Sequence, residues 1–421
     1  MAARIATLQR LPVATIVLAL IPIAMVLAYR ALLAADPEPT RNDQVQYLAL
    51  ARGFLDRGEF TRAVPGEPFV PEPLRYPGYP LFVAFLCGTV GCEHVVEAQA
   101  VLLAITVFMV VRLARSFVGT RAALAAGGIV AVFPAFSYFA ALRLSETLAT
   151  FLLVASSAAV VALLERPSRA RAVACGVLLG ALALTRPFFL PLPLFLVVIP
   201  LAPRYRSRSL AAAAVVALAA YAVVIGPMVA YSISNFGRPF TGNLGAQLWQ
   251  GYFQGRTRAD LDDFEREQVD LAVVAIQRQE GLADRREQAY AYVALDEELR
   301  RRAIDLIRHD PLGWVARGAL RSAELWGGDP PARDSGTTLP PTARALWYAL
   351  NLSLLGVGII GAIRLLRRPS VAAAIPLAIV VFVWLLSFPL WAEGRYSLPA
   401  KPFLAIGAVA ALGPRRPAAP S

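Results

Sequence analysis

The segment LPVATIVLALIPIAMVLAY (residues 11–29) is uncharged and predominantly apolar, and the polar tetrapeptide RNDQ (residues 41–44) follows it closely. A helix needs about 20 mostly apolar residues to cross a bilayer, and this segment meets that requirement. Similar segments recur along a chain that is 57% hydrophobic and has a mean hydropathy of +0.56. The sequence therefore predicts an all-α polytopic membrane protein whose first span ends shortly before the carboxylate of Asp43.

Further apolar segments extend this pattern, so we expect about ten transmembrane helices. The candidate spans are 11–33, 95–117, 122–140, 144–164, 172–186, 188–202, 209–232, 344–363, 371–390 and 400–413. Residues 172–202 are divided by Arg186-Pro187 into halves that are short for a span, which leaves two short helices or a re-entrant pair. The first segment could also be a cleaved signal peptide ending near Ala34-Ala35, but its apolar region is longer than the roughly 7–15 residues usual for one.

Basic residues concentrate in the short loops on one side of this ten-span arrangement. They are Arg4, Arg10, Arg112, Arg115, Arg121, Arg166, Arg169, Arg171, Arg204, Arg206, Arg208, Arg364, Arg367, Arg368, Arg415 and Arg416. Because short cytoplasmic loops are enriched in arginine and lysine, we predict that this side, with both termini, is cytoplasmic. Segments 36–76 and 235–343 hold 24 acids and 19 arginines and would then lie outside a bacterial inner membrane.

The arrangement divides the chain into three parts. An N-terminal membrane module (1–234) has about seven spans and an outer loop (36–94), an outer-face, periplasmic insertion covers 235–343, and a C-terminal module (344–421) has about three spans. Charged and apolar residues recur at helical spacing in the insertion, so we expect it to be helical. In the outer loop, we predict a helix over 43–57 that is capped by Asp43 and Gln46, and an apolar run over 78–91 at the membrane interface.

Several common kinds of site are excluded. The net charge of +12 is spread over membrane loops, so no nucleic-acid partner is expected. GVGIIG (356–361) matches the dinucleotide-binding glycine pattern, but it lies inside an apolar segment with no strand before it, which indicates close helix packing. With two histidines and no zinc-type cysteine spacing, no histidine-based metal site and no zinc site are expected. Cys87 and Cys92 could pair only if Gly88 and Gly91 reverse the chain, and we expect them to be unpaired.

Two acids are candidates for chemistry because the arrangement places them at the outer ends of spans. Asp43 is a candidate general base, and the alternative is a structural role as a helix cap. Glu146 lies between two apolar runs and is expected to line a polar cavity. The alternative for Glu146 is an ion pair with Arg143, three residues earlier on the same helix.

Six cations are predicted at the same interface: Arg30, Arg143, Arg186, Arg344, Arg395 and Lys401. Any one of them could be a snorkelling anchor. However, Arg186 precedes a proline in LTRP (184–187), and Arg395 and Lys401 share the turn EGRYSLPAKP (393–402). Several fixed cations at one leaflet are suited to holding a phosphate at the level of the lipid headgroups.

Five motifs in this order resemble those of the bacterial polyprenyl-phosphate-sugar-dependent glycosyltransferases with a GT-C fold. They are the Asp after the first span, RYPGYP (75–80), Ser145-Glu146, TRP (185–187) and RYSLP (395–399). Related families include the protein O-mannosyltransferases and the lipid A aminoarabinose transferase. The resemblance covers about 11–234 and 344–413, and it is loose in the insertion. It implies a GT-C-like bundle with interface helices in the first outer loop.

The resemblance implies that Asp43 takes a proton from an acceptor hydroxyl, and that the sugar moves from polyprenyl phosphate with inversion. Arg186, Arg395 and Lys401 would stabilise the leaving phosphate. The implied substrate- and donor-binding residues are Tyr47, Arg75, Tyr79, Arg143, Glu146, Arg186, Arg395, Tyr396 and Lys401. The acceptor would be an envelope glycan, lipid or protein. Many relatives carry two adjacent acids where this chain has Asn42-Asp43, so no metal ligands are assigned, although the sequence is compatible with a divalent cation.

Two other functions remain open at this stage. A transporter or flippase of a lipid-linked glycan would use the same interfacial cations, although the sequence shows no inverted repeat and no paired broken spans. A non-catalytic envelope-assembly protein would use residues 235–343 as a docking surface. Polar residues at the outer ends of spans argue against this assembly function.

Overall fold

The computed structural model describes residues 13–34, 41–198, 207–328, 340–367 and 370–412, and within these ranges the secondary structure is helical. Five helices are long and apolar enough to cross a membrane: α2 (Val13–Ala34), α5 (Val95–Ala114), α8 (Glu146–Glu165), α11 (Arg208–Phe236) and α17 (Pro341–Leu366). A sixth span would combine α6 (Thr120–Val132) and α7 (Pro134–Ala140), which meet at a bend of 52°. The bend falls at a proline, whose ring and missing N–H interrupt a helix. The chain is therefore an all-α, multi-pass membrane protein.

The remaining predicted spans are shorter helices. They are α9 (Arg169–Thr185), η3 (Pro187–Phe189) with α10 (Leu194–Val198), η7 (Val371–Ala374) with α18 (Ile375–Ser387), and η8 (Gly394–Ala400) with α19 (Lys401–Leu412). Helical segments thus occur at all ten predicted positions. The chain leaves the helix at Arg186, as expected for the residue before a proline. Part of the 188–202 segment, and the predicted cytoplasmic residues Arg4, Arg10, Arg204, Arg206, Arg368, Arg415 and Arg416, lie outside the described residues.

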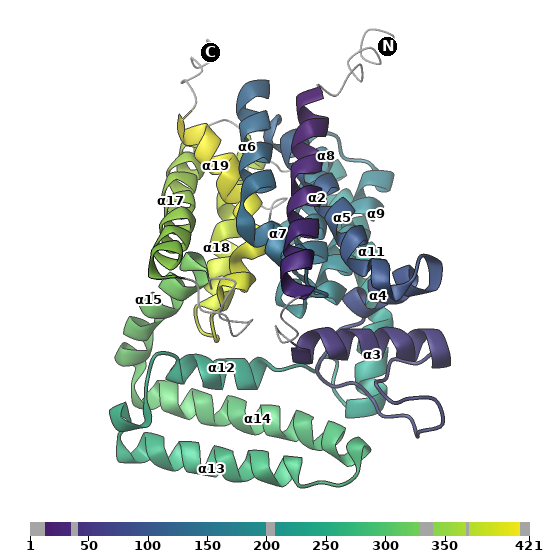
Figure 1. The fold of residues 1–421 in the computed structure, drawn as a ribbon, viewed down its shortest axis with the longest axis vertical. Helices are drawn as coiled ribbons and strands as arrows, with labels where there is room; N and C mark the ends of the chain where they lie inside the picture. The colour runs from purple at the N-terminus through teal and green to yellow at the C-terminus, as the bar shows by residue number, and fades with distance from the viewer. Residues whose placement is uncertain (1–12, 35–40, 199–206, 329–339, 368–369, 413–421) are drawn as a thin grey trace.

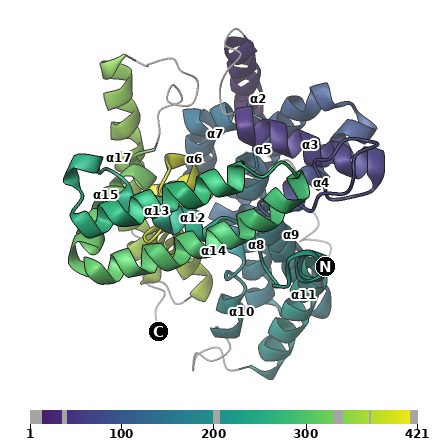
Figure 2. The ribbon, with the colours of Figure 1, turned by 90° about the horizontal axis from the view of Figure 1, so that it is seen from below.

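A second group of helices covers one end of the bundle, as Figure 1 shows. It contains α3 (Arg41–Arg57), α4 (Gly78–Thr89), η2 (Cys92–His94), α12 (Leu244–Phe253), η6 (Arg258–Asp260), α13 (Asp263–Glu280), α14 (Arg285–His309) and α15 (Pro311–Gly327). Helices α12, α13 and α14 run across this end (Figure 2), and α15 leads back to the bundle. Val13 of α2 and Leu412 of α19 lie toward the opposite end. The helical insertion predicted between the two membrane modules is therefore present.

The glycine pattern at 356–361 serves helix packing, as predicted. It lies inside α17, which packs along α19. A methyl group on Gly361 would collide with the backbone carbonyl of Gly407, and one on Gly407 would collide with that of Gly358. Only glycine at these positions allows the two backbones to approach so closely.

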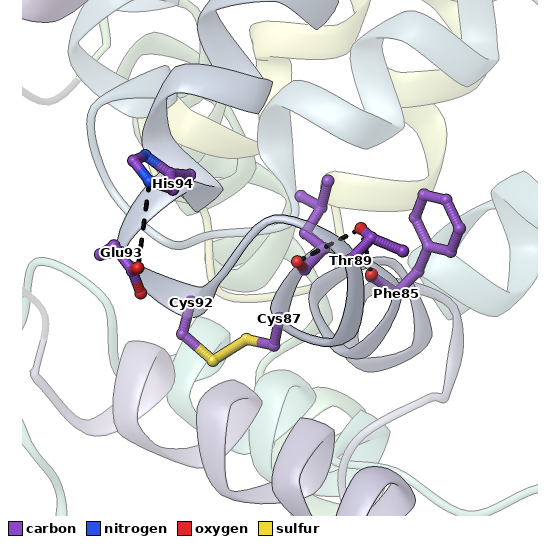
Figure 3. The surroundings of a disulfide bond; sticks show 7 residues. Phe85, Cys87, Thr89, Cys92, Glu93 and His94 are labelled. Carbon is purple, nitrogen blue, oxygen red and sulfur yellow. Dashed lines mark hydrogen bonds and ion pairs between the residues drawn. A yellow bond between two sulfur atoms is a disulfide. The ribbon is translucent and has the colours of Figure 1, made fainter.

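Two local predictions are wrong. Helix α3 begins at Arg41, so Asp43 lies in its first turn and does not cap it. Cys87 and Cys92 form a disulfide at the junction of α4 and η2, as Figure 3 shows. Gly91 adopts a φ of 101° just before Cys92, a left-handed backbone conformation that glycine adopts without strain and that reverses the chain.

Candidate active site

Asp43 is placed by α3, which lies across the end of the bundle and packs against α4. One turn further along α3, the buried Tyr47 meets Tyr79 of α4 edge to face, with 4.8 Å between ring centroids. Tyr79 in turn donates a hydrogen bond to Gln99 of α5 (2.9 Å). These contacts fix the start of α3 against the bundle, and they leave the Asp43 side chain 24% exposed.

Two guanidinium groups hold the Asp43 carboxylate. Arg75 pairs with its Oδ1, and Arg395 Nη1 lies 3.2 Å from its Oδ2. Burial by itself would raise the pKa of Asp43, but the two cations and their hydrogen bonds outweigh it and lower that pKa below the ordinary carboxyl value. Asp43 is therefore ionised at neutral pH, and residues far apart in the sequence meet on it.

Arg75 reaches Asp43 because Glu72 organises the loop before it. The buried Glu72 carboxylate accepts hydrogen bonds from the backbone N–H groups of Leu74 (2.9 Å) and Arg75 (3.0 Å). Its other oxygen pairs with Arg62 at 2.6 Å. Sequence reasoning missed Glu72, although its position three residues before Arg75 in PEPLR was a usable signal.

Arg395 also connects Asp43 to Glu146. The Glu146 side chain is 3% exposed, and its Oε1 lies 3.9 Å from Arg395 Nε and 3.4 Å from Arg186 Nη1. Both guanidinium groups lie over the ring of Tyr396, at 5.3 Å and 5.5 Å from its centroid. Arg395 additionally pairs with Glu393, which sequence reasoning did not single out. We call Asp43, Arg75, Glu146, Arg186, Glu393, Arg395 and Tyr396 the Asp43 cluster.

Several buried polar atoms near Glu146 have no hydrogen-bond partner among the residues that the structure describes. They are Glu146 Oε2, Thr147 Oγ1 and Arg143 Nε, while Arg186 Nη1 has only its ion pair with Glu146. Buried polar atoms are nearly always hydrogen-bonded in proteins, so such a group calls for a partner. The atoms belong to one acid, one hydroxyl and two cations, which is the set of groups that a sugar phosphate would satisfy.

The remaining predicted residues divide between this cluster and other places. Glu146 pairs with Arg186 and not with Arg143, whose backbone N–H instead donates to Gln44 of α3 (2.9 Å). Lys401 is almost fully buried and donates to Asn351 of α17, with the ring of Phe133 at 5.3 Å. The structure therefore groups Lys401 with the α17 side of the bundle. Arg30 pairs with Glu97 on α5.

No three histidine, cysteine, aspartate or glutamate side chains within the described ranges come together to hold a metal ion. The groups nearest to Asp43 are the guanidinium groups of Arg75 and Arg395, and each takes one carboxylate oxygen. This donor set does not suit a divalent cation, which prefers several oxygen ligands and no adjacent cation.

Helix packing and the Asp43 cluster together define a membrane-embedded bundle with a polar site under a helical cover. No family model matches the sequence, and no curated protein matches it significantly. Among solved structures, the apo form of the Archaeoglobus fulgidus oligosaccharyltransferase matches with a TM-score of 0.58 and 16% identity, over 95% of this chain and 50% of that one. The chain therefore has a GT-C fold, as the sequence predicted.

Two further structures extend this comparison. The Archaeoglobus fulgidus oligosaccharyltransferase AglB in complex with an inhibitory peptide and a dolichol-phosphate matches with a TM-score of 0.56 and 15% identity, over 94% of this chain and 50% of that one. ArnT from Cupriavidus metallidurans bound to undecaprenyl phosphate matches with a TM-score of 0.42 and 14% identity, over 94% of this chain and 77% of that one. The chain spans about half the length of the oligosaccharyltransferase that it matches.

Proposed function

We propose that this protein is a membrane glycosyltransferase that transfers a sugar from a polyprenyl-phosphate donor to an envelope acceptor on the outer face of a bacterial inner membrane. The observation that carries the proposal is the Asp43 cluster, in which a carboxylate and two arginines adjoin buried polar atoms without partners. The shared fold supports it, because one of the AglB structures that match this chain is a complex with a dolichol-phosphate. A lipid-linked donor also suits a site outside the cytoplasm, where nucleotide sugars are absent.

The proposed reaction is a single displacement. Asp43 takes the proton of an acceptor hydroxyl as the hydroxyl oxygen forms a bond to the anomeric carbon. The bond from that carbon to the phosphate oxygen breaks on the opposite face, and its electron pair stays on the lipid phosphate. Attack and departure on opposite faces invert the anomeric configuration, and the transition state has oxocarbenium character.

The arginines supply the charge that this step requires. Arg186 and Arg395 would bind the phosphate and stabilise its added negative charge as the bond breaks. Asp43 and Glu146 share Arg395, so a phosphate that draws Arg395 away leaves Asp43 more basic. Donor binding would in this way activate the base. No step passes through a metal ion, because the groups around Asp43 do not fit one.

Transfer of label from a radiolabelled polyprenyl-phosphate sugar to envelope fractions tests the proposal. Purified Asp43→Asn should bind the donor but transfer roughly 10²–10⁴-fold more slowly, the range for loss of a general base. Asp56→Asn, at an exposed site on the same helix, is the matched control and should transfer at the wild-type rate. Arg395→Met should weaken donor binding, and EDTA should leave the wild-type rate unchanged.

Three results would contradict the proposal. Equal transfer rates for Asp43→Asn and wild type would show that Asp43 is not the general base. If no polyprenyl-phosphate sugar is consumed, but reconstituted vesicles move a lipid-linked glycan across the bilayer, the protein is a flippase. If the protein neither consumes the donor nor moves the glycan, the non-catalytic envelope-assembly function is the one that remains.

A further inference from the structure

A cavity of about 440 Å³ lies between the first outer loop and the insertion. Its walls combine α3 and residues 62–74 on one side with α13 and α14 on the other. Its polar and charged lining residues are Gln46, Arg62, Glu72, Gln279, Arg285, Gln288 and Tyr292. Its volume is within the range of small-molecule sites in proteins.

The cavity adjoins the Asp43 cluster through Gln46. Gln46 is three residues after Asp43 on α3, which is about 4.5 Å along the helix axis. Its side-chain oxygen accepts a hydrogen bond from Arg75 Nε (2.9 Å), and Arg75 pairs with Asp43. A molecule in the cavity could therefore place one group at Asp43 while the rest of it contacts the insertion.

The cations of the cavity are already neutralised. Arg62 pairs with Glu72 at 2.6 Å, and the lining residue Arg285 pairs with Glu67 at 3.2 Å. An acidic ligand would have to compete with Glu72 and Glu67 for these guanidinium groups and would lie beside the buried Glu72 carboxylate, so an acidic acceptor is disfavoured. A lipid acceptor is disfavoured as well, because seven of the thirteen lining residues are polar or charged and the lining comes from the outer loop and the insertion.

What remains is a lining suited to neutral hydroxyl groups. Gln46, Gln279 and Gln288 each carry a carboxamide, which can donate to one hydroxyl and accept from its neighbour. The ring of Tyr292 and the rings of Pro71 and Pro73 offer flat apolar surface to the C–H face of a sugar. Amides beside apolar rings match a carbohydrate better than they match a charged or fully apolar group.

We propose that this cavity is the acceptor site and that it selects a neutral glycan, whose reacting hydroxyl points toward Asp43. The inference rests on the proposed function and narrows its acceptor from glycan, lipid or protein to one class. Gln279 and Gln288 then determine acceptor specificity, and both come from the insertion. The insertion thus contributes directly to the choice of acceptor.

Binding to the purified full-length protein, measured by saturation-transfer NMR and calorimetry, tests this assignment. The probes are neutral oligosaccharides, the same chain lengths containing uronic acid, and a serine- and threonine-rich peptide. Neutral oligosaccharides should bind best, and Gln279→Leu/Gln288→Leu should weaken them about tenfold, equivalent to about 1.4 kcal/mol. Gln277→Leu, at an exposed site on α13, is the matched control and should bind like wild type.

Folding must be kept separate from recognition, because Gln288 also donates to the backbone carbonyl of Leu282. Gln279→Leu alone avoids that bond and should still weaken the neutral glycan by several fold, with an unchanged melting temperature. Preferred binding of the uronate or the peptide, or full binding by both variants, would overturn the assignment.

The result also separates this inference from the proposed function. Asp43→Asn should bind the oligosaccharide as wild type does while failing to transfer sugar. If wild type consumes the lipid donor but binds no neutral glycan, the acceptor assignment fails and the enzyme function stands. If the cavity binds the glycan but no donor is consumed, the enzyme function fails and the assignment as an acceptor site falls with it.

Discussion

Asp43 shares its two carboxylate oxygens between arginines that are 320 positions apart in the chain, Arg75 and Arg395. The two arginines keep the Asp43 carboxylate ionised, but they also reduce its basicity. A carboxylate held in this way becomes an effective base only when one guanidinium group finds another anion. In the proposed mechanism, the cluster would therefore link proton transfer by Asp43 to binding of the donor phosphate.

The lowered pKa of Asp43 predicts how its contribution to stability depends on pH. Burial opposes the shift, and Arg75 and Arg395 produce it. Because the folded-state pKa is below the unfolded value of about 3.9, the stabilisation is complete above that value and disappears as the pH falls through the folded one. Asp43→Asn should therefore be less stable than wild type by about 1–3 kcal/mol at pH 7, the cost of losing a charged hydrogen-bond partner.

Thermal unfolding in detergent, followed by tryptophan fluorescence from pH 3 to 7, measures this difference. The gap between wild type and Asp43→Asn should be constant above about pH 5 and should narrow as the pH falls below the unfolded-state pKa of about 3.9. The exposed Asp56→Asn should show no such gap. The absence of a gap at pH 7, or a gap that does not narrow between pH 5 and pH 3, would mean that the ionised Asp43 does not stabilise the fold through its two ion pairs.

Part of this site could be predicted from single residues. Asp43, Glu146, Arg186 and Arg395 stood out because charged residues near apolar segments are costly and need a reason. Glu72 and Glu393 did not, because they lie in polar loops where acids are ordinary. They matter because the fold places Glu72 against the backbone N–H of Arg75, and Glu393 against the Arg395 side chain. Lys401 shares a turn with Arg395, but the sequence did not reveal that its ammonium group donates a hydrogen bond to Asn351.

Among the elements, the disulfide between α4 and η2 gives a direct test. The bond closes a short loop, for which the chain-entropy model gives about 2 kcal/mol of stabilisation. Cys87→Ser/Cys92→Ser should lower the free energy of unfolding by about that amount and leave donor binding unchanged. Urea unfolding with and without dithiothreitol measures it, and the reductant should affect only wild type. A reductant effect on the double-serine variant would point to another cause.

Helix α15 has its apolar side outward. Leu312, Val315 and Leu320 are 82%, 52% and 59% exposed, while Arg321 on the inner side is 1% exposed. The Arg321 guanidinium donates to three backbone carbonyls, of Trp314, Gly251 and Phe388. A helix that buries its arginine and exposes leucine and valine side chains is suited to contact with lipid. Helix α15 also contacts α17 and α18 of the bundle.

We therefore expect the outer side of α15 to lie in the bilayer interface. A bimane fluorophore on Leu320→Cys, in vesicles containing spin-labelled lipids, should be strongly quenched. The same fluorophore on Glu267→Cys, at an exposed site on α13, should not be. Equal quenching at both sites, or none at Leu320→Cys, would show that α15 faces water or another protein.

For the whole molecule, apolar segment length and the alternation of charge between loops were sufficient to predict the class of fold. Helical segments lie at the ten predicted positions, and among the described residues five helices, or six with the bent α6–α7 pair, are long and apolar enough to cross a membrane. These segments are recognisable because burial in lipid places a strong and local demand on composition. Segment length and loop charge could not predict the bend before Pro134 as a 52° break, nor the disulfide, because both depend on local backbone geometry. They also could not predict that α13 and α14 line a cavity together with α3 and residues 62–74, since that arrangement joins distant parts of the sequence.

The final prediction concerns the orientation of the whole molecule, on which the choice of donor depends. In the structure, α13 lies at the end of the bundle that carries Asp43, and the loop before α9 lies at the other (Figure 1). Two exposed residues report on these ends: Glu267 on α13 and Arg169 at the start of α9. Background labelling should be low, because Cys87 and Cys92 are bonded and Cys175 is buried.

A membrane-impermeant maleimide should therefore label Glu267→Cys on intact spheroplasts and Arg169→Cys only in inverted vesicles. This result would place the Asp43 cluster outside the cytoplasm, where a sugar must arrive on a lipid. The reverse pattern would place the same carboxylate and arginines in the cytoplasm. Nucleotide sugars are available there, but the chain has no phosphate-binding glycine loop to hold one. The labelling pattern thus decides whether the arginines of the cluster bind a lipid phosphate or require a different explanation.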